Sequence, residues 1–275
     1  MGAKSLKYYF LSIFCLWAAN VNVNGNLHKT SYCMQRYCGS KNLACNNHGN
    51  YSNDCVPSSR TIPLSKHRNG LLNVFNELRN KLAGGHIGSH LPAARMARMS
   101  WSNELEYLAH LAVLNCRENV KYCLSSPDFH YIGSNINQFS YGGKVSIYTN
   151  FEIMLKLIDK WTSEMAFVNK DATLYVPDHF PNDKVVQSAL LMMDRNTHVG
   201  CAALRYSIEY YNHFLFCCTF ATDVIKHKPL YKLSGKPGSA CQNRDTTYTN
   251  LCAVGEVYGN EHAIAHARVY RSPTI

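Results

Sequence analysis

The sequence of 275 residues lacks the short motifs that mark several large enzyme classes. It contains no Gly-x-Ser-x-Gly turn for a serine nucleophile and no Gly-x4-Gly-Lys-Ser/Thr loop for a nucleotide phosphate. A Gly-x-Gly-x-x-Gly dinucleotide loop and a His-Glu-x-x-His zinc motif are also missing. The sequence therefore gives no support to serine hydrolase, P-loop, dinucleotide-binding or zinc-peptidase chemistry.

The sequence also lacks a segment suited to spanning a membrane. Beyond the amino terminus no run approaches about 18 uninterrupted apolar residues. Residues 1–25 have the pattern of a secretory signal, in which Lys4 and Lys7 precede an apolar run from Tyr8 to Ala19 that is too short to cross a bilayer. We therefore expect an exported, extracellular protein without a membrane anchor.

None of the 12 cysteines stands in a Cys-x2-Cys pair, the spacing typical of structural zinc sites. Cys15 lies in the expected signal and leaves with it, so eleven cysteines remain. In an exported chain such cysteines are expected to form disulfides, and the odd number leaves one thiol over. Asn50 begins the sequon Asn-Tyr-Ser, which predicts a glycosylated surface loop.

Acidic side chains are in the minority. The 28 Lys and Arg against 18 Asp and Glu give a formal net charge of +10. This excess favours an anionic partner such as an acidic glycan, a lipid headgroup or an acidic protein. Nucleic acid is not expected, because no recognition motif accompanies the charge and the chain is exported. Solubility alone explains the charge equally well, so the partner stays unidentified.

Composition divides the chain after the signal into three parts. Residues 26–60 are polar and hold four cysteines, which predicts a cysteine-rich extension. Residues 61–225 carry the helical and strand patterns of a single domain. Residues 226–275 are basic and rich in Pro and Gly at their start, which predicts a linker, a small loop closed by Cys241 and Cys252, and a tail.

Apolar residues spaced by three and four positions predict helices over 67–82, 102–116, 151–167 and 185–193, and the pattern over 92–99 indicates a short helical turn. Helical and strand-like segments alternate unevenly along the chain. We therefore expect a three-layer α/β/α arrangement around a small antiparallel or mixed sheet.

Two β-like runs follow the last of these helices, from Val199 to Tyr206 and from Phe214 to Ala221. Their spacing predicts an antiparallel hairpin. Cys201 could be bridged across it to either Cys217 or Cys218. A helix that leads directly into a bridged hairpin is the predicted core of the domain.

Two groups of histidines have a metal-like spacing. His86 and His90 stand four residues apart, but glycines beside and between them disfavour the helix that such a site needs. Glu261, His262 and His266 lie in the basic tail, where a frayed end explains them better than a ligand set. We expect no metal at either place.

Six short motifs follow one another along the chain: Asn76-Glu-Leu-Arg79-Asn80 with Gly84-Gly85, Ala93-Ala-Arg-Met with Trp101, Leu105 to Cys116, Gly133-x-Asn135-Ile, Trp161-x-x-Glu164 and Asn196-Thr-His-Val-Gly-Cys201. In this order they resemble the CAP superfamily of cysteine-rich secretory, antigen 5 and plant pathogenesis-related proteins. The early motifs Tyr32-Cys-x4-Cys38 and Ala44-Cys-Asn-Asn-His-Gly-Asn50 resemble its insect antigen-5-related branch. The resemblance extends over residues 31–255.

The resemblance implies an α/β/α sandwich and a cleft in which two histidines and two acids can hold a divalent cation such as zinc. Carried over one by one, these groups fall on Val120, Ser134, Glu164 and Gln187. Only Glu164 keeps the expected type. We therefore expect a degenerate cleft with no cofactor, no high-affinity metal and no catalytic acid or base.

The resemblance also implies five disulfides: Cys33–Cys45, Cys38–Cys123, Cys55–Cys116, Cys201–Cys218 and Cys241–Cys252. Under this pairing Cys217 is the remaining thiol, on the opposite face of its strand. We expect it to be buried and inert.

Together these features predict a secreted, non-enzymatic binding or signalling protein, acting as a monomer. The resemblance implies saliva, venom or a male reproductive secretion as the fluid. The alternative is an extracellular carrier of sterols or fatty acids, and a hydrolase is the least favoured interpretation.

Overall fold

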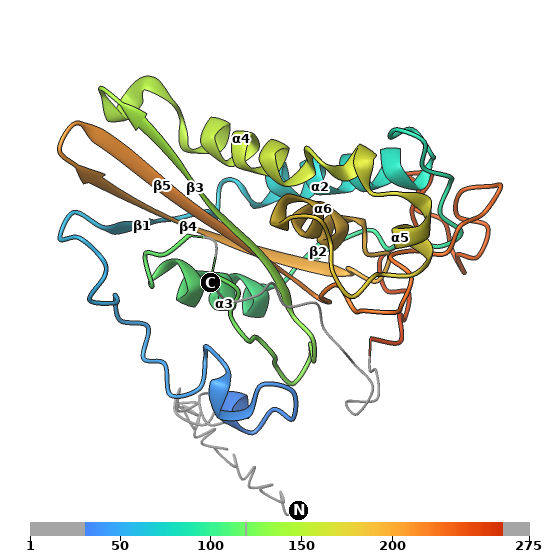
Figure 1. The fold of residues 1–275 in the computed structure, drawn as a ribbon, viewed down its shortest axis with the longest axis horizontal. Helices are drawn as coiled ribbons and strands as arrows, with labels where there is room; N and C mark the ends of the chain where they lie inside the picture. The colour runs from blue at the N-terminus through green and yellow to red at the C-terminus, as the bar shows by residue number, and fades with distance from the viewer. Residues whose placement is uncertain (1–30, 119, 261–275) are drawn as a thin grey trace, which may run out of the picture.

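The computed structural model describes residues 31–118 and 120–260, so the expected signal and the histidines of the tail lie outside the described residues. Helices α2 (Arg68–Ala83), α4 (Asn150–Thr162) and α6 (Asp183–Met192) cover one face of a five-stranded sheet. Helix α3 (Asn103–Val113) covers the other face (Figure 1). This arrangement confirms the expected three-layer α/β/α sandwich.

The predicted hairpin forms the centre of the sheet. Strands β4 (His198–Ile208) and β5 (Tyr211–Phe220) are antiparallel, with Cys201 opposite Cys218. Strand β3 (Gly133–Gly142) pairs with the far side of β5 over its whole length. The hairpin therefore positions every other element of the sheet.

Two short strands pair with the outer edge of β4. Strand β1 (Arg60–Ile62) is antiparallel to it and β2 (Ser100–Trp101) is parallel to it, which makes the sheet mixed. The remaining elements are short: η1 (Gly39–Lys41), η2 (Val145–Ile147), η3 (Met165–Phe167) and α5 (Lys170–Leu174). No helix of the described ranges is long and apolar enough to cross a bilayer.

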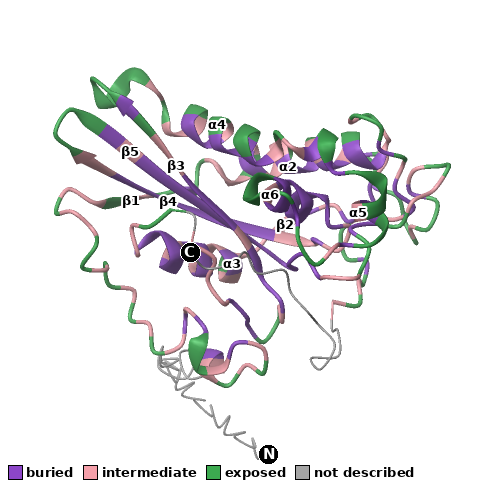
Figure 2. Cartoon of the chain, in the orientation of Figure 1, coloured by how far each residue is buried: buried purple, intermediate pink, exposed green. Residues whose placement is uncertain are grey.

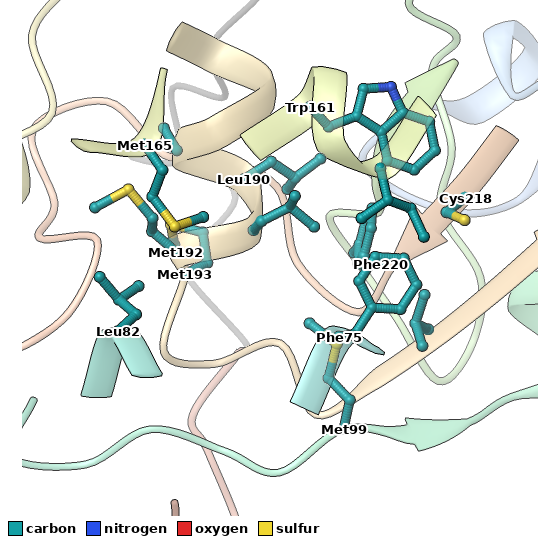
Figure 3. Packing of buried hydrophobic residues seen from close by; sticks show 14 of the residues in the cluster. Phe75, Leu82, Met99, Trp161, Met165, Leu190, Met192, Met193, Cys218 and Phe220 are labelled. Atoms are coloured by element: carbon teal, nitrogen blue, oxygen red, sulfur yellow. The ribbon is translucent and has the colours of Figure 1, made fainter. Parts of the chain in front are cut away.

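Alternate residues of β5 supply two separate cores. Phe216, Cys218 and Phe220 pack toward α2, α4 and α6, whereas Leu215 and Cys217 pack toward α3. The buried inner faces are purple in Figure 2, and Figure 3 shows the larger core around Phe220. Because burial of one such side chain contributes roughly 1.5–3 kcal/mol, the period of two in this strand stabilises both layers.

Among the described residues there are five disulfides, and they are the pairs that the resemblance implies: Cys33–Cys45, Cys38–Cys123, Cys55–Cys116, Cys201–Cys218 and Cys241–Cys252. Cys217 is a buried free thiol. Its position on the α3 side of the sheet keeps it away from the Cys201–Cys218 bridge, and burial raises its pKa, which leaves the thiol protonated and unreactive.

The prediction of a single helix over residues 151–167 is wrong. Helix α4 ends at Thr162, and η3 follows it as a separate turn. The hydroxyls of Thr162 and Ser163 donate to the carbonyl oxygens of Asp159 and Lys160. These side-chain bonds compete with the helical pattern and favour its end at this point.

Two irregular segments pack against each other where the sequence predicted a helical turn and a linker. Residues 92–99 form no helix; Ala93 and Ala97 make isolated β-bridges with Leu233 and Cys252. Within 226–238, Leu230 and Tyr231 are fully buried. This extended segment therefore contributes to the core of the domain.

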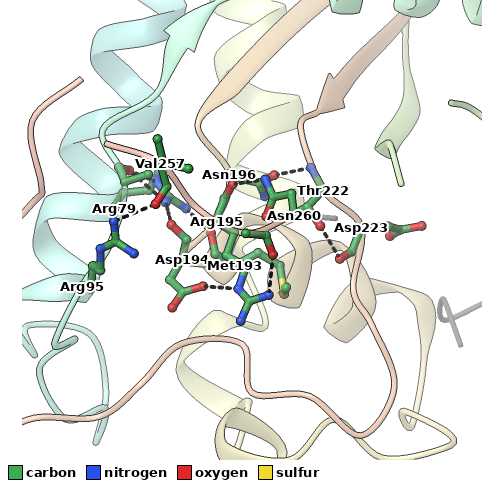
Figure 4. A network of polar contacts seen from close by, with 12 residues as sticks. Arg79, Arg95, Met193, Asp194, Arg195, Asn196, Thr222, Asp223, Val257 and Asn260 are labelled. Carbon is green, nitrogen blue, oxygen red and sulfur yellow. Dashed lines mark hydrogen bonds and ion pairs between the residues drawn. The ribbon is translucent and has the colours of Figure 1, made fainter. Parts of the chain in front are cut away.

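Arg79 ties these segments to the rest of the fold (Figure 4). Its guanidinium is buried and donates to the carbonyl oxygens of Ala97, Leu191, Met193 and Asp194 at 2.8–3.2 Å. One side chain thereby joins α2, α6 and the irregular 92–99 segment.

The Asp194 carboxyl gives the fold a predicted pH dependence. Burial raises its pKa from 3.8 to about 6, and nearby Arg195 and Arg79 only partly oppose this. Because the folded-state pKa lies above the unfolded one, stability falls as pH rises through this window, by up to about 3 kcal/mol. We expect Asp194→Asn to be more stable than the unaltered chain near neutral pH and equal to it at about pH 3.5, as measured by urea unfolding. An equal difference at both pH values would contradict this.

Candidate functional site

A small pocket lies where β3 meets the first turns of α6. Its volume is about 70 Å³. The pocket is lined by Val120, Lys121, Ser134, Asn135, Ile136, Asp183, Val186, Gln187, Leu190 and Asp223. Three of the four positions expected from the resemblance, Val120, Ser134 and Gln187, therefore come together from three separate parts of the chain.

Gln187 is held in place by hydrogen bonds at both its ends. Its position is set by α6, which begins where the Asn182 side chain accepts the backbone N–H of Val185. The Gln187 side-chain amide donates to Asn137 Oδ1 at 2.8 Å, and Asn135 Nδ2 donates to the backbone carbonyl oxygen of Gln187 at 3.1 Å. Gln187 therefore joins α6 to β3 through its side chain and its backbone.

The same Asn137 oxygen accepts a second bond from α4. Trp161 Nε1 donates to Asn137 Oδ1 at 2.6 Å, and the indole stacks on Phe216 with ring centres 5.3 Å apart. An amide oxygen has two lone pairs, so the bonds from Gln187 and Trp161 use both. Both acceptor positions of this oxygen are thus used by contacts within the protein.

Val120 and Ser134 provide no group that can exchange a proton near neutral pH. Val120 presents only an apolar side chain, and Ser134 is a neutral hydroxyl on β3 opposite Thr219 of β5. Neither group titrates near neutral pH. The pocket therefore has no imidazole at either position where the resemblance places one.

Glu164 lies apart from this pocket. It is half-buried, directly precedes η3 after the end of α4, and is not among the described residues that line the pocket. Because α4 stops at Thr162, Glu164 does not continue the inward stripe of that helix. Three of the four expected positions therefore line the pocket, and the fourth, Glu164, lies outside it on the turn before η3.

Lys121 and Asp223 are pocket residues that the sequence did not reveal. Lys121 Nζ lies 3.0 and 3.2 Å from the two carboxylate oxygens of Asp223, which is almost fully buried. Asp223 Oδ1 also accepts the backbone N–H of Val224 at 2.8 Å. The two residues are 102 positions apart, so no local pattern could have indicated the pair.

The positions that the resemblance assigns to ligands, Val120, Ser134 and Gln187, do not fit a bound divalent cation. Val120 has no donor atom, Ser134 is a weak neutral ligand, and the Gln187 amide donates to Asn137. The Lys121 ammonium stands beside the buried Asp223 carboxylate and repels a second cation there. We therefore derive no step that uses a metal.

Comparison with known proteins identifies the fold. Residues 72–220 match the family model of the cysteine-rich secretory protein family, CAP. The chain belongs to this family. CAP relatives include tabinhibitin 1 of Tabanus yao, 30% identical over 75% of this chain and 80% of the relative. The antigen 5 like allergen Cul n 1 of Culicoides nubeculosus is 32% identical over 68% of this chain and 84% of the relative. The expected insect antigen-5-related branch is thereby confirmed.

Solved CAP structures agree with the architecture. NaASP2 with Zn²⁺ superposes with a TM-score of 0.56 at 19% identity, over 69% of this chain and 96% of its own. BmVAL-1 superposes with a TM-score of 0.54 at 16% identity, over 72% of this chain and 98% of its own. At this identity the likeness is one of fold, and the zinc in the first structure is a property of that protein.

Proposed function

We propose that this CAP chain is an exported, non-enzymatic binding protein that acts in an extracellular fluid. The observation that carries the proposal is the state of Gln187, whose amide is bonded to Asn137 in a pocket without imidazole. Gln and Ser do not titrate near neutral pH and cannot serve as general acid or base. The CAP scaffold is kept, and none of Val120, Ser134 and Gln187 can transfer a proton near neutral pH.

Charge and family support the binding role. Without Lys4 and Lys7 of the expected signal, 26 basic against 18 acidic side chains give a formal charge of +8, which favours an acidic extracellular protein, an acidic glycan or a lipid as partner. Relatives named as allergens, venom allergens and tabinhibitins fit saliva or venom as the fluid, and a male reproductive secretion is the other setting. We propose a monomer that acts through its surface.

A lipid carrier is the second candidate. The pocket at Gln187 is too small for a sterol or fatty acid, since pockets for ligands of that size have volumes of roughly 300–1,000 Å³. A larger hollow of about 600 Å³ lies between β1, α3 and the start of α2. Its rim carries the ion pair of Arg68 with Glu106, which suits the polar end of an amphipathic ligand. Binding of sterols and fatty acids to the delipidated protein would separate the carrier from the leading proposal.

Zinc calorimetry tests the leading proposal. We expect no submicromolar binding, and identical heats for the unaltered chain and for Glu164→Gln, because Glu164 is the only acid left of the expected set. Submicromolar binding that disappears in Glu164→Gln would contradict the degenerate site. Hydrolytic turnover that disappears in Glu164→Ala would contradict the non-enzymatic role.

A further inference from the structure

Two turns lie side by side at one end of the sheet. The β4–β5 turn and the connection from β3 to α4 are joined there: the Gly143 N–H donates to the Tyr210 carbonyl, and Asn212 Nδ2 donates to the Gly143 carbonyl at 2.8 Å. Figure 1 shows the hairpin end projecting beyond the helices, and Figure 2 shows it as exposed. The two turns therefore adjoin each other at this end of the sheet.

This end of the sheet exposes five large apolar or aromatic side chains, which we call the tip patch. Their exposed fractions are 87% for Tyr210, 56% for Tyr211, 54% for Ile147, 45% for Ile208 and 43% for Val145. Single exposed apolar residues are ordinary on any protein surface. A group of five on two adjoining turns indicates contact with a partner.

An aromatic cluster supports the tip patch from below. The rings of Phe139, Tyr141 and Tyr148 lie 5.3–5.9 Å apart in tilted and edge-to-face pairs. The Tyr141 hydroxyl donates to the Val145 carbonyl at 2.8 Å, which fixes the start of η2. The η2 side of the patch is therefore preformed, and a partner would not have to order that part.

Cations flank the tip patch. Lys144 is exposed next to Val145, and Lys156 Nζ lies 5.3 Å from the centre of the Tyr148 ring. Arg60 is exposed on β1, opposite Arg205 of β4.

Two acids lie near these cations. Glu152 accepts the backbone N–H and the hydroxyl of Thr149 in the cap of α4. Glu209 is exposed within the β4–β5 turn itself. A carboxylate in a helix cap keeps its charge, so the three cations outnumber these two acids by one.

This composition matches the interface of a lipid bilayer. Tyrosine rings are enriched at headgroup level, with an apolar body toward the acyl chains and a hydroxyl toward water. Each Lys or Arg near an anionic membrane surface adds electrostatic attraction to it. Two narrow projecting turns can enter the headgroup layer of a bilayer. A flat protein surface would contact only the ends of these turns.

We propose that the tip patch is a membrane-contact surface that inserts into the interface of phospholipid bilayers with anionic headgroups. Ile147, Ile208 and Val145 enter the acyl boundary, the tyrosines lie at headgroup level, and Lys144 and Lys156 face the lipid phosphates. The contact is peripheral and uses none of the residues of the Gln187 pocket, so it does not depend on the function proposed for that pocket.

Vesicle flotation of the whole exported chain tests this contact. We expect the protein to float with vesicles of phosphatidylcholine and phosphatidylserine, and to float less as salt is raised. The double variant Tyr210→Ser, Ile147→Ser should lower the partition coefficient about tenfold or more. The matched control is Phe167→Ser, which removes a side chain that is 75% exposed on η3, outside the patch, and should leave binding unchanged. Both substitutions are at exposed positions, and circular dichroism checks that the fold is kept.

Three results would overturn the contact. The first is no flotation with vesicles of either phosphatidylcholine alone or the mixture. The second is an equal loss of flotation in Phe167→Ser and in the double variant. The third is a concentration-dependent dimer that disappears in the double variant while no vesicle binding is seen, which would assign the patch to a second copy of this chain.

Discussion

Gly200→Ala is expected to destabilise this protein far more than the same substitution at a glycine with open space around it. A Cβ at this position would overlap the backbone nitrogen of Glu106 and adjoining backbone atoms of α3. The helix cannot withdraw easily, because Ser102 caps its first turn and the Thr219 hydroxyl donates to the Leu105 carbonyl at 2.8 Å. We expect a loss of about 3 kcal/mol or more, or failure to form the bridged hairpin.

The measurement is the urea midpoint of the purified chain, together with the yield of fully disulfide-bonded protein. Gly235→Ala is the matched control, since a Cβ there would meet nothing within 4 Å. Its free energy of unfolding should stay within about 0.5 kcal/mol of the unaltered chain. Equal midpoints for the two variants would show that α3 does not press on β4 as described.

Arg79→Met is expected to have the second large effect. Methionine fills much of the same volume but leaves the carbonyl oxygens of Ala97 and Leu191 without their donor. The carbonyl oxygens of Met193 and Asp194 lose the guanidinium and keep one backbone N–H donor each. Burial already lowers the pKa of Arg79 to about 10, which shows how far its charge is removed from water. We expect a loss of about 3–5 kcal/mol, because several buried acceptors lose a charged donor at once.

Thermal unfolding monitored by circular dichroism checks this effect. Arg117→Met is the control, because Arg117 pairs with Asp54 on the surface and both side chains are largely exposed. Surface pairs of this kind contribute little to stability, so the control should unfold at the temperature of the unaltered chain. Similar unfolding temperatures for the two variants would rule out a structural role for the buried guanidinium.

The fold could be predicted where local periodicity decides it. The helix over 185–193, the two strands after it and their antiparallel pairing follow from spacings within some 35 residues. The end of α4 could not be predicted, because side-chain hydroxyls at Thr162 and Ser163 stop a stripe that continues in the sequence. Local bonds overrode the apolar pattern there.

The candidate site also has a part that could be predicted from the sequence and a part that could not. Val120, Ser134 and Gln187 were placed by the resemblance, and the structure brings them to one pocket. The Lys121–Asp223 pair could not be predicted, because it joins residues 102 positions apart that carry no motif. The tip patch was equally hidden, since its exposure depends on which turns the sheet brings together.

The part of the small pocket formed by Val120 and Lys121 is held by disulfides on both sides. Val120 and Lys121 lie between Cys116 and Cys123, and each of these cysteines is bonded to the amino-terminal extension, at Cys55 and Cys38. Closing loops of 61 and 85 residues, the two bonds constrain this wall without help from any ligand. A protein that relies on a metal to shape its site loses the shape with the metal. Here the disulfides at Cys116 and Cys123 hold the shape of the wall. The residues between these cysteines can therefore be substituted without loss of the surrounding fold.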